Sequence, residues 1–370
     1  MKNLSKNTRT ARFMWLMPAA LAAAGVVTAG MLAGPGTAAG AGPHPGTACD
    51  AVQASIVDGT LKVQGTDASD RIALELQAGN FDVLQVDIGD DGSPDLSFPR
   101  SEVAKIVVDA GNGDDSVRID ETNGVFSDAI PTTLDGGNGD DRLVGGAGAG
   151  TLDGGDGNDN LIGGSGAEQL LGGGGNDTID GNKGNDTAEM GDGEDTFTWD
   201  PGDGSDVVEG DSGGRDTMIF NGAGIAEKVD LTANGNRLTF HRDVANVTMD
   251  TAGVERVVFN ALAGEDLVTV NDLRGTDVKE LVVDLAGTLG GDTGDTAADD
   301  IVVNGTDGND KVNVDGHEDV HVHGLAPTVR ILHTDGATDR LDIDTQAGND
   351  TVKSHLAPGL IDLFVNGVQS

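Results

Sequence analysis

A regularly spaced set of acidic residues is the first feature of this sequence that could do chemistry. From residue 136 to residue 198, seven nine-residue units follow one another without a break: GGNGDDRLV, GGAGAGTLD, GGDGNDNLI, GGSGAEQLL, GGGGNDTID, GNKGNDTAE and MGDGEDTFT. Glycine fills the fourth position of every unit, and the sixth position holds Asp141, Gly150, Asp159, Glu168, Asp177, Asp186 and Asp195. Carboxylates repeated at a fixed interval supply hard oxygen ligands, which is the chemistry that Ca²⁺ requires.

The other positions of the unit indicate how these carboxylates are held in place. Glycine allows a tight turn to enter backbone regions closed to other residues, so that carbonyl oxygens can approach one point. Apart from Ala188, the eighth position holds a large apolar residue in every unit: Leu143, Leu152, Leu161, Leu170, Ile179 and Phe197. A flexible Gly/Asp linker gives no reason for this apolar position. We therefore interpret each unit as a turn followed by a short strand that faces a core.

The units resemble the RTX repeat G-G-x-G-x-D-x-U-x, a calcium-binding parallel β-roll. The resemblance covers residues 136–209, because a two-residue insertion after Thr198 leads to PGDGSDVVE, which has Asp206 at its sixth position. It implies that the first six residues of a unit form a turn around Ca²⁺ and that the last three form a strand. The calcium-site residues that it implies are Asp115, Asp141, Asp159, Asp177, Asp186, Asp195 and Asp206, with Gly137, Gly139, Gly155, Gly157, Gly173 and Gly175 in the turns.

The two sides of such a roll would carry different ligands if two units make one coil. Alternate units then place Asp141, Asp159, Asp177 and Asp195 in one column, and Gly150, Glu168, Asp186 and Asp206 in the other. We expect a continuous row of Ca²⁺ on the first side and fewer or weaker sites on the second. Without Ca²⁺ the aspartates repel one another, so we expect the metal-free segment to be expanded or disordered.

The flanks of the repeats resemble the same solenoid in a degenerate form. Strand-like runs occur at residues 61–63, 71–76, 83–88, 105–109, 255–259, 267–270, 280–285 and 301–303, and looser echoes of the turn contain Asp70, Asp115, Asp216, Asp266, Asp310 and Asp350. We predict an all-β protein, a right-handed parallel β-roll or β-helix solenoid whose degenerate flanking coils act as caps. Its predicted parts are a strand-rich N-terminal cap (42–109), a calcium-binding roll (110–209) and a degenerate C-terminal region (210–370). The alternative is three separate domains.

The N-terminus and the overall charge predict where the protein works. Residues 1–41 contain a basic start, an uncharged run over 13–33 and small residues near 37–41, which is the order of a secretory signal peptide. A membrane anchor is the alternative, but we expect cleavage near residue 39 or 41, a spare thiol at Cys49, and an extracellular protein with no membrane association. The formal net charge of −41 excludes a nucleic-acid partner. The sequence does not identify a protein or surface partner.

Two enzyme classes were weighed against a purely calcium-binding protein. Residues 317–324, HEDVHVHG, contain the H-E-x-x-H pattern of zinc proteases, but the valines around it alternate as in strands, and Pro327 stands at the third ligand position. His321 and His323 could share one strand face there. A calcium-dependent polysaccharide lyase would need clustered basic residues and aromatic platforms, whereas Arg237, Arg242 and Arg256 are scattered and Trp199 is the only tryptophan after the leader. We expect no catalysis.

Overall fold

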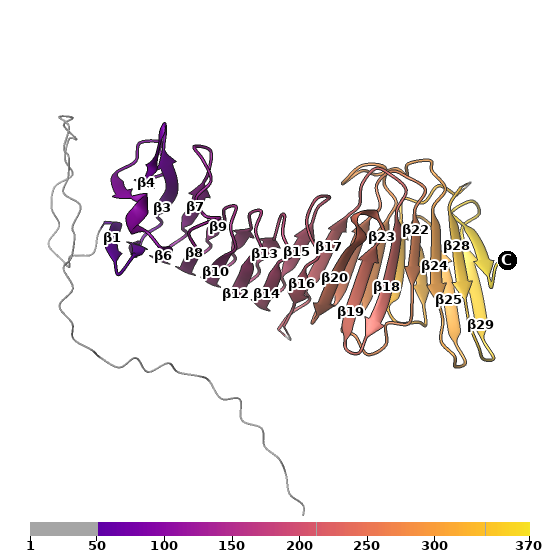
Figure 1. The fold of residues 1–370 in the computed structure, drawn as a ribbon. Helices are drawn as coiled ribbons and strands as arrows, with labels where there is room; N and C mark the ends of the chain where they lie inside the picture. Colours follow the sequence, from indigo (N-terminus) through magenta and orange to yellow (C-terminus); the bar gives the residue numbers. More distant parts are fainter. Residues whose placement is uncertain (1–50, 212, 337) are drawn as a thin grey trace, which may run out of the picture.

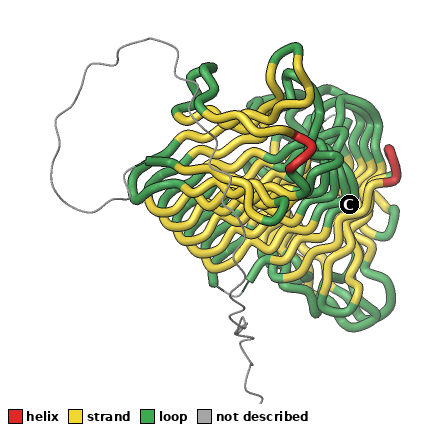
Figure 2. Tube along the Cα trace, turned by 60° about the vertical axis from the view of Figure 1, so that its left-hand side comes forward, coloured by secondary structure: helices red, strands yellow, loops and turns green. Residues whose placement is uncertain are grey.

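The chain winds into a long two-sheet solenoid, seen from the side in Figure 1 and obliquely in Figure 2. The computed structural model describes residues 51–211, 213–336 and 338–370, so the predicted signal peptide and Cys49 lie outside the described residues. No helix in these ranges is long and apolar enough to cross a membrane. The helices found there are the short 3₁₀ turns η1 (Arg100–Glu102) and η2 (Val244–Asn246).

Each face of the solenoid is one continuous sheet. In spatial order, the first sheet contains 16 strands: β1 (Gln53–Val57), β2 (Thr60–Gln64), β6 (Lys105–Asn112), β8 (Thr132–Asn138), β10 (Gly150–Asp156), β12 (Gln169–Gly174), β14 (Thr187–Asp192), β16 (Val207–Glu209), β20 (Val247–Ala252), β19 (Arg237–Arg242), β18 (Lys228–Asn234), β22 (Leu267–Val270), β24 (Asp300–Asn304), β28 (Arg340–Asp344), β30 (Asp362–Val365) and β31 (Val368–Gln369). The second contains 15: β29 (Thr351–Leu356), β25 (Lys311–Gly316), β26 (Val320–His323), β27 (Thr328–Leu332), β23 (Glu280–Asp284), β21 (Arg256–Asn260), β17 (Thr217–Asn221), β15 (Thr196–Trp199), β13 (Thr178–Asp180), β11 (Asn160–Ile162), β9 (Arg142–Val144), β7 (Ser116–Asp120), β3 (Arg71–Gln77), β4 (Asn80–Ile88) and β5 (Leu96–Pro99).

In the repeat region two nine-residue units make one coil. Leu152 is in register with Leu134 on one side and with Leu170 on the other, in parallel pairs 18 residues apart. On the opposite sheet Leu161 is in register with Leu143 and Ile179 at the same spacing. The eighth-position side chains of the seven units are buried. The predicted coil length and the predicted parallel β-roll are therefore confirmed.

One hydrophobic core runs the length of the solenoid. It extends from Val52 to Leu363 and includes the eighth-position residues of the repeats. Directly after the repeats it becomes aromatic, because Trp199 stacks on Phe220 with ring centroids 4.0 Å apart and Phe220 packs against Phe240 at 4.4 Å. The flanks thus belong to the same β-solenoid as the repeats. The domain boundaries at residues 109 and 209 stay predictions.

The flanks are not purely parallel, which corrects the simplest form of the expected β-helix. Antiparallel pairs join β1 to β2, β3 to β4, β4 to β5, β18 to β19, β19 to β20, β25 to β26, β26 to β27 and β30 to β31. Two of these hairpins turn at Asp58-Gly59 and Asn366-Gly367, where both residues have positive φ. Two positive φ values define the type I′ turn, for which Asp-Gly and Asn-Gly are the preferred dipeptides. Those dipeptides are the sequence signal for the hairpins.

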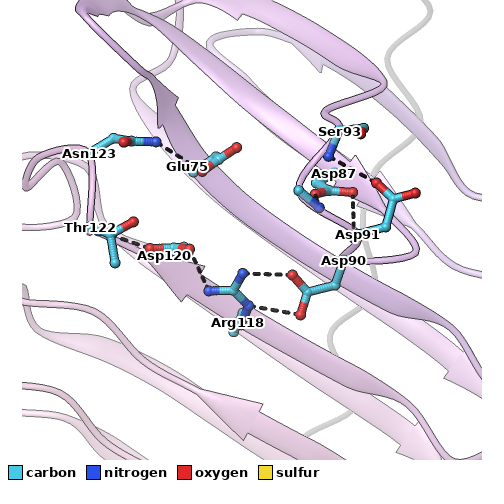
Figure 3. A network of polar contacts seen from close by, with 10 residues as sticks. Glu75, Asp87, Asp90, Asp91, Ser93, Arg118, Asp120, Thr122 and Asn123 are labelled. Carbon is cyan, nitrogen blue, oxygen red and sulfur yellow. Dashed lines mark hydrogen bonds and ion pairs between the residues drawn. The ribbon is translucent and has the colours of Figure 1, made fainter.

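A polar network fastens the N-terminal flank to the first coil of the roll (Figure 3). Arg118 on β7 pairs with Asp90, which lies in the loop between β4 and β5, and with Asp120 on its own strand, both at 2.6 Å. The Arg118 guanidinium holds the pKa of Asp90 below its usual range. Asp87, 2% exposed, accepts the Gly92 N–H at 2.7 Å and so fixes the same loop. The loop is thereby held against the coil that precedes the repeats.

Candidate metal centre

The turns of the first column stack so closely that their glycines leave no room for a side chain. Gly155 and Gly157, at the second and fourth positions of their unit, have φ of +104° and +145°. A Cβ atom on Gly155 would lie 2.0 Å from the carbonyl oxygen of Gly137, and one on Gly157 would lie 1.9 Å from that of Gly139. The same close approach recurs at Gly173 and Gly175 in the next coil. The predicted site glycines therefore bring backbone carbonyls of successive coils together.

Glycine replacements should show how strictly this stacking is required. We expect Gly157→Ala to destabilise the protein by roughly 2–5 kcal/mol, because it combines an unfavourable φ with a backbone overlap. Gly174→Ala is the matched control, since the nearest atom to its added Cβ is Asp156 Oδ1 at 3.5 Å. We expect it to change stability by about 0.5 kcal/mol or less. Urea unfolding in the presence of Ca²⁺ measures both, and equal losses would contradict the tight stacking.

The sixth-position aspartates of the first column form a buried ladder of hydrogen bonds. The backbone N–H of Asp141 donates to Asp159 Oδ1 at 2.7 Å, that of Asp159 to Asp177 at 2.8 Å, and that of Asp177 to Asp195 at 2.7 Å. Each of these four aspartates is at most 2% exposed. Their carboxylates therefore lie inside the turns, one per coil, exactly 18 residues apart in sequence.

One oxygen of every ladder carboxylate within the repeats, and of several beyond them, is buried and has no hydrogen-bond partner. This holds for Oδ2 of Asp115, Asp141, Asp159, Asp177, Asp186, Asp195, Asp206, Asp216 and Asp266, for Oε1 of Glu168 and for Oε2 of Glu227. A buried carboxylate without a partner is costly, so such oxygens are suited to bind a cation. The point where Gly154 would carry a Cβ lies 2.3 Å from Asp159 Oδ2 and 2.6 Å from the Gly172 carbonyl oxygen. Oxygens this closely spaced fit the hard-oxygen ligand set of Ca²⁺.

Backbone oxygens must complete each such site. Within the described ranges, no three His, Cys, Asp or Glu side chains converge on one point that could hold a metal ion. Ca²⁺ takes six to eight oxygen ligands and accepts backbone carbonyls readily. The stacked glycine turns supply carbonyls beside each carboxylate, so the chemistry of the donor set suits Ca²⁺ and does not suit a metal that needs nitrogen or sulfur ligands.

The second column is shorter, as its residue order predicts. Glu168 donates its N–H to Asp186 Oδ1 and Asp186 donates to Asp206 Oδ1, both at 2.8 Å. Gly150 brings no carboxylate to this column. The Glu168 carboxylate bends back to its own turn, where it accepts the Gly164 N–H at 3.2 Å. The two columns thus differ at their N-terminal ends.

The ladder continues beyond the residues that the repeat pattern singled out. Toward the N-terminus, Asp70 donates to Asp115, which donates to Asp141, and toward the C-terminus Asp195 donates to Asp216. The degenerate echoes at Asp70 and Asp216 were the sequence signal for these rungs. Asp216 donates in turn to Glu255, and on the side of the second column Glu227, Asp266, Asp299 and Asp339 form a further ladder in later coils. Sequence reasoning did not single out Glu255, Glu227, Asp299 or Asp339.

Burial changes the acidity of the ladder carboxyls. Burial is the main cause that raises the pKa of Asp141 and Asp177 to about 7, and repulsion from neighbouring carboxylates adds to it. The same burial raises the pKa of Asp115 and Asp216 to about 6. Because the folded-state pKa lies above the ordinary value of 3.8, protonation stabilises the metal-free roll. That contribution is complete below about pH 4 and is lost as the pH rises through about 7.

Proton competition should therefore weaken calcium binding in mild acid. We expect the Ca²⁺ concentration at the binding midpoint to rise roughly fivefold or more between about pH 7.5 and about pH 6, because each bound ion displaces protons from such carboxyls. Over the same range the metal-free protein should become more stable. Calcium titrations and urea unfolding at several pH values measure both trends. A midpoint that does not change with pH would contradict the raised pKa values.

The H-E-x-x-H segment forms a hairpin, as its alternating valines predict. β25 and β26 pair antiparallel across a turn that contains His317 and Glu318. His321 and His323 share one face of β26, with their rings nearly parallel and 5.9 Å apart. The segment therefore lacks the helix that would place His317 and His321 side by side around zinc. Trp199, the remaining aromatic candidate for a sugar platform, is buried in the core.

Comparison with known protein families agrees with the geometry of the turns. Residues 135–170 and 162–197 match the family described as RTX calcium-binding nonapeptide repeat (4 copies). No curated protein matches the chain. The matched residues span the units in which the aspartate ladder and the glycine stacks are most regular.

Proposed function

We propose, from the premise that residues 135–197 are RTX repeats that bind Ca²⁺, that this is a secreted protein whose roll folds around the ion and which acts by binding rather than catalysis. The observation that carries the proposal is the ladder of buried carboxylates, each with one oxygen that has no partner. When its carboxylates are ionised, such a ladder is stabilised by cations that neutralise it.

The ligands that we propose come from both columns of turns. In the first column, Asp115, Asp141, Asp159, Asp177 and Asp195 supply carboxylates, and carbonyls of turns that contain Gly137, Gly139, Gly155, Gly157, Gly173 and Gly175 complete the sites. In the second column, Asp186 and Asp206 take the same role. When bound, Ca²⁺ supplies the positive charge that holds adjacent coils together, and the chain's own turns orient the oxygens toward it.

Secretion and the absence of catalysis rest on separate observations. The residue order of the first 41 positions is typical of an exported protein. Calcium sites that need about millimolar Ca²⁺ for occupancy are typical of extracellular modules. The hairpin of β25 and β26 supports a structural role for the H-E-x-x-H residues, because they lie in a turn and a strand and not on the helix that this zinc site needs.

Calorimetric titration tests the proposed function on the mature chain, residues 42–370, after removal of metal with a chelator. We expect several Ca²⁺ ions to bind with midpoints in the range of about 10⁻⁴–10⁻³ M, and Mg²⁺ to bind much more weakly because it demands a near-ideal octahedron. Equal affinity for the two ions, or fewer than two bound Ca²⁺ per chain, would overturn the proposal.

A further inference from the structure

A turn in the C-terminal flank adopts the backbone of the calcium turns with only part of their sequence. Residues 261–266 read ALAGED and lie outside the residues that match the RTX family. Leu262 has a φ of +66° and Gly264 a φ of +140°, so the second and fourth positions are left-handed as they are at Gly155 and Gly157. A leucine at positive φ is unfavourable, because its Cβ crowds the following carbonyl oxygen. The turn therefore keeps the conformation of the roll against its local preference.

Asp266 has the same surroundings as a ladder aspartate of the roll. It is 2% exposed, its Oδ1 accepts the Glu227 N–H at 2.7 Å, and its own N–H donates to Asp299 Oδ1 at 2.8 Å. Its Oδ2 is buried and has no hydrogen-bond partner. Asp177 has the same three features between Asp159 and Asp195. An aspartate this deeply buried, with one oxygen unpartnered, indicates a ligand that neutralises it.

The charges of the neighbouring coils show on which side a cation is missing. Glu227, on one side of Asp266, forms a buried ion pair with Arg242, whose guanidinium also lies 5.3 Å from the Trp199 ring centroid. On the other side, Asp299 is 2% exposed. Among the described residues, neither Asp266 nor Asp299 takes part in an ion pair. The Glu227 side thus has a positive charge at Oε1, whereas no basic side chain pairs with either carboxylate on the Asp299 side.

We propose that a Ca²⁺ ion binds between the turn 261–266 and the adjacent turn that ends at Asp299, far from the repeats in sequence. Asp266 Oδ2 and the Asp299 carboxylate supply side-chain oxygens, and backbone carbonyls of the two turns complete the site. Arg242 takes the place of an ion beside Glu227. The inference rests on the proposed function, because it assumes that the same turn geometry binds Ca²⁺ in the roll.

Hydrogen exchange of the full mature chain tests the site, with Asp266→Asn as the variant. The asparagine can still accept the Glu227 N–H but carries no charge. We expect saturating Ca²⁺ to slow exchange in residues 256–304 of the wild type by about tenfold or more. This is the factor expected when the free Ca²⁺ concentration is about ten times the dissociation constant of the site. In Asp266→Asn this calcium effect should be lost, while metal-free exchange becomes slower than in the wild type. Asp300→Asn, an exposed charge change on the adjoining strand β24, should behave as the wild type.

The outcomes separate this site from the roll. If the repeats respond to Ca²⁺ and residues 256–304 of the wild type do not, the proposed site is wrong and the proposed function stands. An equal calcium response in Asp266→Asn and in the wild type would likewise rule out the proposed site and leave the proposed function standing. If the repeats themselves do not respond, the proposed function fails together with this inference. Should Asp266→Asn not fold, the wild-type response and the corresponding Asp299→Asn variant decide the question.

Discussion

Removing Ca²⁺ at neutral pH should unfold the repeat region while the aromatic part of the C-terminal flank stays ordered. The repeats have a thin core, because each of the first six units buries one apolar side chain at its eighth position and a glycine at its first, and only the seventh adds a second large one, Met190. In the flank, a single strand such as β21 buries both Val257 and Phe259. Without an ion, the aspartate columns add electrostatic repulsion to this small hydrophobic gain. The repeats therefore depend on the metal far more than the flank does.

Hydrogen exchange with and without chelator measures this difference segment by segment. We expect amides of residues 136–198 to lose nearly all protection in chelator, and those of β17, β20 and β21 to keep most of theirs. When the free Ca²⁺ concentration is about ten times the dissociation constant of a site, binding at that site adds roughly 1.4 kcal/mol to the free energy of unfolding. Several such sites together are enough to keep a marginally stable segment folded. Equal protection of the repeats in chelator and in Ca²⁺ would show that the roll is stable without metal.

Replacing an aspartate in the middle of the first column should weaken calcium-driven folding far more than replacing the glutamate of the second column. Asp177→Ala removes the acceptor of the Asp159 N–H and one unpartnered buried oxygen. A buried donor left without a partner costs about 1–3 kcal/mol, which corresponds to a roughly 5- to 150-fold higher calcium midpoint. Asp159→Ala should have a similar effect, because Asp159 is the acceptor for Asp141.

Glu168→Ala is the matched control for these two variants. Glu168 accepts an N–H from its own turn, at Gly164, and the preceding position of its column is Gly150, which has no carboxylate. We expect its calcium midpoint to rise no more than about threefold, or less than 1 kcal/mol. Circular dichroism at increasing Ca²⁺ gives the midpoints of all three variants. Equal midpoints for Asp177→Ala and Glu168→Ala would contradict the asymmetry of the two columns.

The regular part of the molecule could be predicted from sequence because its chemistry recurs at a fixed interval. Glycine at position four of every unit, an acidic residue at position six of all but one and an apolar residue at position eight define the turn, the rung and the core, and the register of Leu134, Leu152 and Leu170 confirms the coil of 18 residues. Eight strands of the flanks were also predicted, at residues 61–63, 71–76, 83–88, 105–109, 255–259, 267–270, 280–285 and 301–303. Periodicity therefore specified both the fold and the two columns.

The parts that sequence missed depend on contacts between units whose spacing varies. Glu227, Asp266, Asp299 and Asp339 are separated by 39, 33 and 40 residues, because hairpins and loops lengthen these coils, and of the four only Asp266 lies in an echo of the turn. Because this spacing varies, no sequence period predicts that these four residues lie in neighbouring coils. In the sequence Arg242 is one of several scattered basic residues, yet in the fold it is buried against Glu227 and pairs with one rung. Only the folded coil shows this pairing.

A crystal structure of the mature chain grown with Ca²⁺ tests the central claim most directly. The account predicts a row of ions along the first column, each about 2.3–2.6 Å from the Oδ2 atom of Asp141, Asp159, Asp177 or Asp195. Asp135 and Asp153 lie in register on the outer face of the first sheet. They serve as the comparison, because the account places the row of ions at the buried carboxylates and not at these outer ones. Ions bound at those outer carboxylates, with no density beside the four buried oxygens, would contradict the account.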